Sequence, residues 1–202
     1  MKLYYSPGAC SLSAHIALHE AGLDHEGVLT PTKTHKTPDG TDYYTINPLG
    51  YVPFLVLDDG RTLHEGPAIV QYIADQVPEK NLAPANGTYE RYKLQEWLTF
   101  IGTELHKNFS PLFNPATPDE VKATTVAHLM KRLTWVDSEL AGKDYLLGSN
   151  YSVADGYLFT VTNWASYVGM DISGLVNIGT FRARVGARPA VIAAMKAEGL
   201  IK

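Results

Sequence analysis

The chain contains almost no cysteine and no long apolar run. Cys10 is the only cysteine among 202 residues, so no disulfide can form within the chain, and a reducing cytoplasm is the expected compartment. No apolar stretch approaches the length needed to span a membrane. The first residues turn polar before the apolar core of a signal peptide could develop. We therefore expect a cytoplasmic protein without a membrane partner.

Basic residues are also fewer than acidic ones. The 17 lysines and arginines are outnumbered by 21 aspartates and glutamates, which gives a formal net charge of −4. No segment is basic enough to bind a phosphate backbone, so nucleic acid is not an expected partner. The remaining composition, 45% hydrophobic and 19% charged, is ordinary for a globular protein of one large or two small domains.

The first part of the chain alternates strand and helix patterns. Apolar residues predict strands at 2–5 and 27–30, a hairpin of two strands around Asp59-Gly60, and helices at 11–21 and 66–76. Gly22 suits the end of the first helix. This order predicts an α/β unit with one parallel strand pair and one antiparallel hairpin.

After residue 76 the amino-acid composition of the sequence changes. Residues 77–90 are rich in proline, asparagine and glycine, which indicates a linker, and strand signals are absent beyond residue 65. Helical periodicity then recurs at 89–107, 118–140, 153–168, 175–187 and 190–198. We predict an α/β domain over 1–78, a linker over 79–88 and an all-helical domain over 89–202. Ser152 and Asp155 have the spacing of a capping box at the start of one of these helices.

Cys10 lies between a predicted strand and a predicted helix, in the turn Ser-Pro-Gly-Ala-Cys. Helical amides at that position are expected to point toward the sulfur, to lower the pKa of the thiol and to favour the thiolate. Ser13 stands where a second cysteine of a CxxC pair would be, so any disulfide must form with another molecule. The alternative is a buried cysteine that packs as a small hydrophobic residue.

Two further segments contain groups suited to a peptide ligand. A cis bond between Val52 and Pro53 would leave the Val52 amide and carbonyl open to pairing with a peptide backbone. A trans proline that merely begins a strand is the alternative. At Glu65-Gly66, helix-start amides can hold a carboxylate while Glu65 pairs with an ammonium group, which together suit an amino-acid zwitterion. Glu65 could instead be an ordinary acidic residue at a helix N-terminus.

His106 and Lys107 lie near the end of the predicted helix 89–107. Basic residues there are favoured by the helix dipole alone. They take part in chemistry only if they face the Cys10 side of the chain, which the sequence cannot show.

These motifs occur in a familiar order, and the chain resembles the glutathione transferases, most closely the bacterial beta class. The resemblance covers nearly the whole chain and is carried by the stretches MKLYYSPGACSLSAHIAL, YYTINPLGYVPFLVLDDGRTLHEGPAIVQYIAD, RYKLQEWLTFIGTELHK, PLFNPATPDE and YSVADGYLFTV. It implies a thioredoxin-like N-terminal domain, an all-α C-terminal domain, and a homodimer with glutathione, the co-substrate, in a cleft of each subunit.

The resemblance also implies roles for individual residues. Cys10 would lie beside the glutathione sulfur with His106 close to it, as the catalytic pair. Val52 would pair with the cysteinyl backbone of glutathione, with Pro53 cis. The implied glutathione-binding positions are Ser11, His35, Lys36, Val52, Pro53, Glu65, Gly66, Thr99, Thr103, Glu104 and Lys107. An apolar wall for the second substrate is expected from Phe109, Phe113, Trp164 and Tyr167, and no residue is assigned as a metal ligand.

Two of these positions depart from the pattern of the bacterial class, and a third differs from other classes. His35 stands where lysine is usual, Thr99 where asparagine is common, and Gly66 where many other classes have serine. We expect these differences to affect the affinity for glutathione.

Three functions remain open at this point. The first is detoxifying conjugation of glutathione to small hydrophobic electrophiles. The second is glutathione-dependent thiol-disulfide exchange through a Cys10–glutathione mixed disulfide, which the lone cysteine favours. The third is a non-catalytic ligand-binding module.

Overall fold

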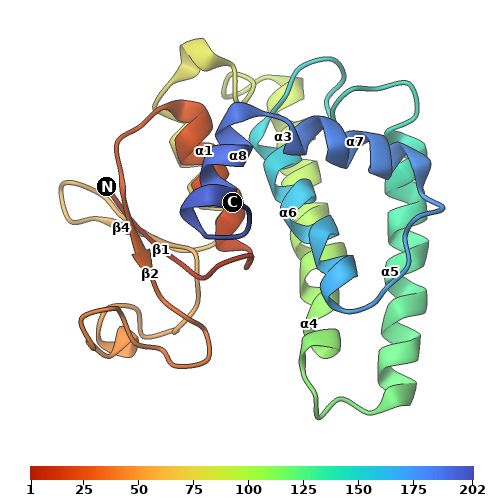
Figure 1. Cartoon of the computed structure of the whole chain (residues 1–202). Helices are drawn as coiled ribbons and strands as arrows, with labels where there is room; N and C mark the ends of the chain where they lie inside the picture. The colour runs from red at the N-terminus through yellow and green to blue at the C-terminus, as the bar shows by residue number, and fades with distance from the viewer. The chain divides into compact units, whose positions relative to one another are not determined.

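The computed structural model describes all 202 residues, which form two spatial units (Figure 1). The first unit comprises Met1–Ala83 together with Ala187–Lys202, and the second comprises Pro84–Gly186. The domain boundaries 1–78, 79–88 and 89–202 stay a prediction, and the spatial division differs from them at the C-terminal end. None of the helices combines the length and the apolar character needed to cross a membrane.

The first unit is built on a four-stranded sheet. Its strands are β1 (Lys2–Tyr5), β2 (Glu26–Leu29), β3 (Phe54–Val56) and β4 (Thr62–Leu63), in the order β2-β1-β3-β4. β1 pairs in parallel with β2 and antiparallel with β3, and β3 pairs antiparallel with β4. Leu3 lies opposite Leu55, and both side chains are fully buried. The predicted parallel pair and hairpin are confirmed.

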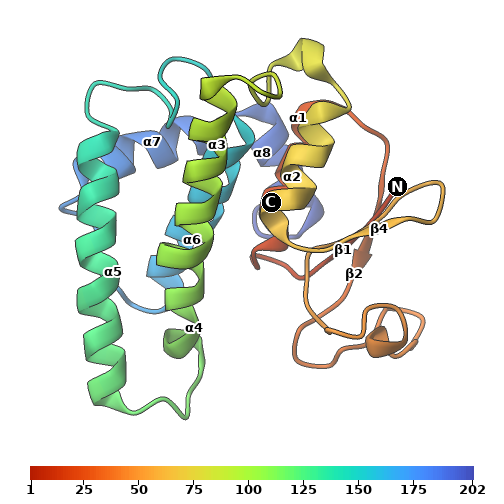
Figure 2. The same ribbon diagram turned by 180° about the vertical axis from the view of Figure 1, so that it is seen from behind.

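Three helices pack in this unit: α1 (Ser11–Ala21), α2 (Gly66–Asp75) and α8 (Pro189–Ala197). Short 3₁₀ turns also form, η1 (Tyr43–Thr45) and η2 (Pro78–Lys80). α1 is buried along most of its length because it contacts β1, α2 and α8, and α8 lies beside it in both views (Figures 1 and 2). The Arg188 guanidinium donates to both oxygens of Glu20 at 2.5 and 2.8 Å, which ties α8 to α1.

The second unit is entirely helical. Its elements are α3 (Tyr89–Phe100), the π-helical segment η3 (Ile101–His106), α4 (Lys107–Phe113), α5 (Asp119–Glu139), α6 (Val153–Tyr167) and α7 (Val176–Gly186). α6 is buried along most of its length and contacts α3, η3 and α7. The α/β and all-helical parts agree with the thioredoxin-like and all-α domains that we expected.

The helix predicted at 89–107 differs from its observed form. It forms as α3, continues through the wider π-helical turns of η3, and extends as α4 to Phe113. Pro111 lies inside α4 and supplies no amide donor. The helix nevertheless continues because Phe109 on its inner side is fully buried, and such packing outweighs local propensity.

The predicted capping box at the start of α6 is confirmed. Asp155 is fully buried, and one of its oxygens accepts from the Ser152 amide at 2.7 Å. Its other oxygen accepts from the Leu146 amide at 2.8 Å. Asp155 therefore joins the preceding loop to the first turn of the helix.

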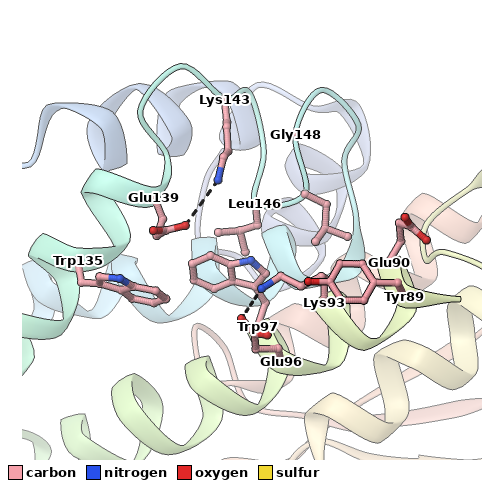
Figure 3. A pocket seen from close by; sticks show the side chains of 11 residues that line it. Tyr89, Glu90, Lys93, Glu96, Trp97, Trp135, Glu139, Lys143, Leu146 and Gly148 are labelled. Carbon is pink, nitrogen blue, oxygen red and sulfur yellow. Dashed lines mark hydrogen bonds and ion pairs between the residues drawn. The ribbon is translucent and has the colours of Figure 1, made fainter.

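A pocket of about 480 Å³ lies on the second unit (Figure 3). Its lining includes Trp97 of α3 and Trp135 of α5, whose rings stack at 5.3 Å between centroids. Two ion pairs also line it, Lys93 with Glu96 and Lys143 with Glu139. None of the residues predicted to form the functional site lines this pocket.

Candidate functional site

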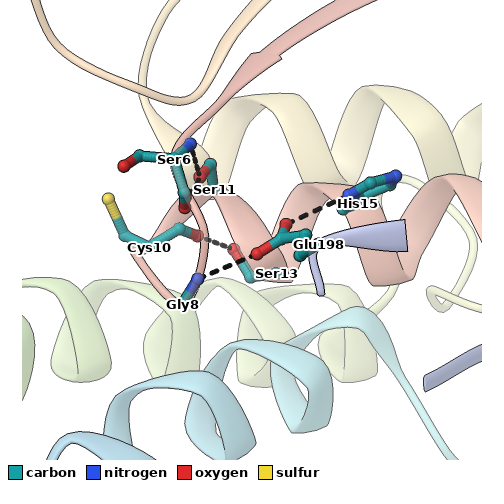
Figure 4. Close-up of polar contacts among 7 residues, drawn as sticks. All are labelled: Ser6, Gly8, Cys10, Ser11, Ser13, His15 and Glu198. Carbon is teal, nitrogen blue, oxygen red and sulfur yellow. Dashed lines mark hydrogen bonds and ion pairs between the residues drawn. The ribbon is translucent and has the colours of Figure 1, made fainter. Parts of the chain in front are cut away.

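Cys10 lies at the end of the turn that leads from β1 into α1 and is partly exposed (Figure 4). Its Sγ lies 3.1 Å from the carbonyl oxygen of Val52, to which the thiol donates a hydrogen bond. This contact places the thiol beside the segment that enters β3. The partial exposure differs from the fully buried cysteine that was the alternative.

The expected attraction between the Cys10 sulfur and the first amides of α1 is not accompanied by a capping hydrogen bond in this structure. Cys10 already has helical backbone angles, φ −57° and ψ −22°, and its side chain forms no capping bond. A residue that caps a helix through its side chain typically has an extended backbone. The thiol donates to Val52 instead, and only the protonated form can do so.

The turn that precedes Cys10 is held from two sides. The Gly8 amide donates to Glu198 Oε2 at 2.9 Å, and Glu198 is a buried residue just beyond α8. The Ser6 amide donates to the Ser11 hydroxyl at 3.1 Å, and that hydroxyl donates back to the Ser6 carbonyl at 3.2 Å. Sequence reasoning missed Glu198, because a partner 190 positions away leaves no local signal.

The cis peptide bond and the start of α2 lie next to this turn. The Val52–Pro53 bond is cis, as the resemblance implied. A Cβ atom added to Gly66 would lie 3.9 Å from Pro53 Cγ and 3.9 Å from Ser13 Oγ. The Ser13 hydroxyl in turn donates to the Cys10 carbonyl at 2.7 Å. These contacts bring Cys10, Val52, Pro53 and Gly66 together within the first unit.

Glu65 immediately precedes α2 in a left-handed conformation with φ of 65°. Such a conformation costs a non-glycine residue about 1 kcal/mol or more, and backbone strain of this kind concentrates at ligand sites. Its carbonyl accepts from the Ala68 and Ile69 amides, and the residue itself is exposed. The carboxylate is thus available to a cationic group of a ligand.

His35 and Lys36 lie in the loop between β2 and η1. The His35 ring packs against that of Tyr44 in a tilted arrangement at 4.7 Å between centroids, and its Nδ1 is buried without a hydrogen-bond partner. Lys36 is exposed. The loop is anchored by Tyr43, whose amide donates to the His35 carbonyl and whose ring packs in the cluster that contains Val52. Their roles toward glutathione stay predictions.

In the second unit, His106 is held at the end of η3. Its Nδ1 lies 2.6 Å from the Tyr157 hydroxyl, and its ring meets Trp164 edge to face at 4.9 Å. Burial, followed by the charge of Lys107, lowers the pKa of His106 to about 4. The imidazole is therefore neutral at pH 7, and Tyr157 can donate to it.

The other predicted polar residues of this segment already have partners in the second unit. Glu104 accepts from the Arg132 guanidinium at 2.7 Å. The Thr103 hydroxyl donates to the Thr99 carbonyl at 3.0 Å. Thr99, Thr103 and Lys107 are exposed. A ligand that bound Glu104 would share its carboxylate with Arg132.

Three of the four residues predicted to form an apolar wall make one aromatic cluster. The Trp164 ring lies 5.7 Å from that of Phe109 and 5.6 Å from that of Phe113. Phe109 is fully buried and Trp164 is 5% exposed, so both belong mainly to the core, whereas Phe113 is 49% exposed. Tyr167, 62% exposed, has no ring contact with this cluster.

Comparison with known proteins gives the family. Residues 8–76 match the family model of the glutathione S-transferase N-terminal domain, and residues 100–189 match that of the C-terminal domain. The chain is 47% identical to the glutathione S-transferase GstA of Escherichia coli O157:H7, over 99% of this chain and 100% of that protein. The chain belongs to the glutathione S-transferase family.

Solved structures agree with this conclusion. A sphingomonad glutathione S-transferase complexed with glutathione is 50% identical, with a TM-score of 0.95 and complete coverage of both chains. A beta-class glutathione S-transferase of Sphingomonas chungbukensis is 49% identical, with a TM-score of 0.96 and complete coverage of both. The two-part fold and the resemblance to the bacterial beta class are confirmed, and glutathione is the co-substrate of the family.

Proposed function

We propose that this chain conjugates glutathione to small hydrophobic electrophiles, as a cytoplasmic homodimer with a detoxifying role. The observation that supports this most directly is the cluster of Cys10, Val52, cis-Pro53 and Gly66 in the first unit. It joins a thiol, the backbone segment at Val52 and a helix N-terminus, which are the groups that a thiol-containing peptide requires.

Glutathione carries two carboxylates and one ammonium group near neutral pH. The α2 amide at Gly66 is placed to hold the γ-glutamyl carboxylate, because helix N-termini favour negative charge. Exposed Glu65 supplies the acid for the ammonium group. Exposed Lys36 of the first unit supplies positive charge for the second carboxylate.

In the conjugation step, the glutathione thiolate forms a bond to the electrophilic carbon, and the leaving group departs with its electron pair. The thiol proton must be lost first, because the thiolate is the nucleophile. Pairing of the glutathione backbone with Val52 would compete for the carbonyl that now accepts from Cys10. Ligand binding would then weaken the bond that favours the protonated Cys10 thiol.

Thiol-disulfide exchange is the second candidate, favoured by the partly exposed Cys10 in a chain with no resolving cysteine. The Cys10 thiolate would attack the glutathionyl sulfur of a mixed disulfide between glutathione and a substrate thiol, form a Cys10–glutathione bond and release the substrate thiolate. A second glutathione thiolate would then attack the glutathione sulfur of that bond, restore Cys10 and leave as oxidised glutathione.

Intact-mass analysis after incubation with oxidised glutathione tests the site. We expect one added glutathionyl group on the wild type and none on Cys10→Ala. Conjugation of a chlorodinitrobenzene and reduction of a mixed disulfide are then compared in both proteins. A variant that conjugates but no longer reduces assigns Cys10 to exchange alone. A wild type that gains no glutathionyl group, fails to bind immobilised glutathione and catalyses neither reaction overturns the proposal in favour of a non-catalytic module.

Assembly and compartment are tested separately. Sedimentation of the purified chain is expected to give twice the monomer mass of 22.2 kDa. Fractionation of the producing cells is expected to recover the chain with cytoplasmic markers. A monomer at micromolar concentration would contradict the proposed homodimer.

A further inference from the structure

Three histidines that sequence analysis assigned to no function lie together in the first unit. His15 and His19 are one helical turn apart on α1, and His25 immediately precedes β2. Their ring centroids form a nearly equilateral triangle, with separations of 5.2, 5.3 and 5.2 Å. One ligand atom from each ring lies within 4.8 Å of those of the other two.

The hydrogen bonds of these rings leave nitrogen atoms available. His15 Nδ1 pairs with Glu198 Oε1 at 3.0 Å, and both side chains are almost completely buried (Figure 4). His25 Nδ1 lies 2.9 Å from the Leu23 carbonyl, to which it can only donate, so its Nε2 carries the lone pair. His19 Nε2 is buried and has no hydrogen-bond partner. An unpartnered buried nitrogen is costly unless a ligand occupies it.

These surroundings resemble the outer shell of a metal site. Metal-binding histidines commonly donate their second nitrogen to a carboxylate or a backbone carbonyl, which fixes the ring and raises its basicity. Glu198 does this for His15, and the Leu23 carbonyl does it for His25. Burial lowers the pKa of both His19 and His25, which favours the neutral imidazole that binds metals.

We propose that His15, His19 and His25 form a binding site for a divalent transition-metal ion, with zinc as the preferred occupant. Three imidazoles, with water as a fourth ligand, suit zinc, whereas magnesium and calcium require oxygen ligands. Partly exposed His19 and His25 provide the path of entry. The site is separate from glutathione chemistry, although Glu198 also holds the Gly8 amide of the turn before Cys10.

Metal binding requires the ligand nitrogen atoms of the three histidines to move closer together. Zinc–nitrogen bonds of about 2.0–2.1 Å place tetrahedral ligand atoms roughly 3.3 Å apart, which is closer than the separations of up to 4.8 Å found here. His25 lies between α1 and β2 rather than inside either element, so small changes of its backbone and side-chain angles can close the gap. A bound ion would then clamp the end of α1 to the start of β2.

Titration of the tag-free full chain with Co²⁺ tests the site. We expect one ion per chain and the intense visible absorption of four-coordinate cobalt, displaced by one equivalent of Zn²⁺. His19→Gln and His25→Gln are each expected to weaken binding at least tenfold. His128→Gln, which removes a histidine of the second unit, and Cys10→Ser are the matched controls and should bind as the wild type does.

Zn²⁺ should also raise the melting temperature of the wild type, because an ion that binds only the folded state stabilises it. The proposal is overturned if wild-type protein binds no cobalt, if bound cobalt keeps a weak six-coordinate spectrum, or if either folded glutamine variant binds as tightly as the wild type. Circular dichroism establishes that the variants are folded. Should neither variant fold, the wild-type cobalt spectrum alone decides.

Discussion

At the scale of single residues, Gly66 offers room for a group that would contact glutathione. A Cβ atom there meets its neighbours at 3.9 Å, which is ordinary van der Waals distance, and the backbone is not left-handed. We expect Gly66→Ser to fold normally and to place a hydroxyl at the α2 N-terminus. One added hydrogen bond of about 0.5–1.5 kcal/mol would tighten glutathione binding about two- to tenfold. Calorimetric titration with glutathione measures this.

Gly66→Ala is the matched control, because it fills the same space without a hydroxyl. Its affinity for glutathione should remain close to that of the wild type. Equal affinities of the serine and alanine variants would show that the γ-glutamyl group lies elsewhere.

His106 makes stability depend on pH. Its pKa is about 4 in the folded chain and 6.5 when unperturbed, so between these values the unfolded state binds the proton more readily. Stability is therefore fully present above pH 6.5 and is lost as the pH falls toward 4. The contribution lost between pH 7 and pH 5 is about 1–2 kcal/mol.

Urea unfolding at pH 7 and pH 5 measures this effect. His106→Gln keeps an acceptor for the Tyr157 hydroxyl but cannot titrate. Between pH 7 and pH 5 its free energy of unfolding should therefore fall by about 1–2 kcal/mol less than that of the wild type. His128→Gln, which removes a partly exposed histidine of the same unit, should retain the wild-type difference. An unchanged acid dependence in His106→Gln would contradict the low pKa.

At the scale of elements, the start of α6 depends on one carboxylate. Asp155→Ala would leave the buried Leu146 and Ser152 amides without their acceptor. We expect a loss of about 3 kcal/mol in the free energy of unfolding, from the lost cap and the unpaired amides. Chemical denaturation measures it.

Asp171→Ala is the control for this prediction. Asp171 also accepts from a backbone amide, that of Ser173, but it is exposed, so water can replace the carboxylate. Little change in stability is expected. A similar loss of stability in both variants would mean that the loss in Asp155→Ala does not come from the burial of Asp155.

The elements also show what sequence patterns can reveal. Alternation and helical spacing predicted the strands and helices of the first unit and most of the second, because each pattern reflects a local buried face. The capping box was visible for the same reason, since Ser152 and Asp155 are neighbours in sequence. The extension of α4 past Pro111 was not visible in the sequence, because burial of Phe109 depends on distant elements.

The functional residues divide in the same way. Cys10, Val52-Pro53 and Glu65-Gly66 were recognisable as motifs, although the direction of the Cys10 thiol was not, since it depends on the Val52 carbonyl 42 positions away. Glu198 carried no local signal, and the spacing of His15 and His19 by one helical turn did not reveal His25 as their neighbour. Their partners are brought together only by the packing of α8 on α1 and the pairing of β2 with β1.

At the scale of the whole molecule, the two ends of the chain belong to the same spatial unit. Residues 187–202 supply Val191 and Ala194 to the core, Arg188 to Glu20, and Glu198 to both Gly8 and His15. We expect a chain ending at residue 186 to lose structure in the first unit, because buried surfaces and hydrogen-bond partners are removed together. A chain ending at residue 200 is the matched control, since it retains Glu198.

Hydrogen exchange separates this expectation from general unfolding. In the chain ending at 186, amides of β1, β3 and α1 should exchange much faster, while those of α6 in the second unit keep most of their protection. Cys10 should react with a disulfide reagent at the rate of an unfolded thiol. The chain ending at 200 should match the full chain in both measurements. If β1 and α1 retain full protection without residues 187–202, then α8 and Glu198 rest on the first unit without stabilising it, and the Cys10 turn is held by bonds near the turn, such as those between Ser6 and Ser11 and from the Ala9 amide to the Ser6 carbonyl.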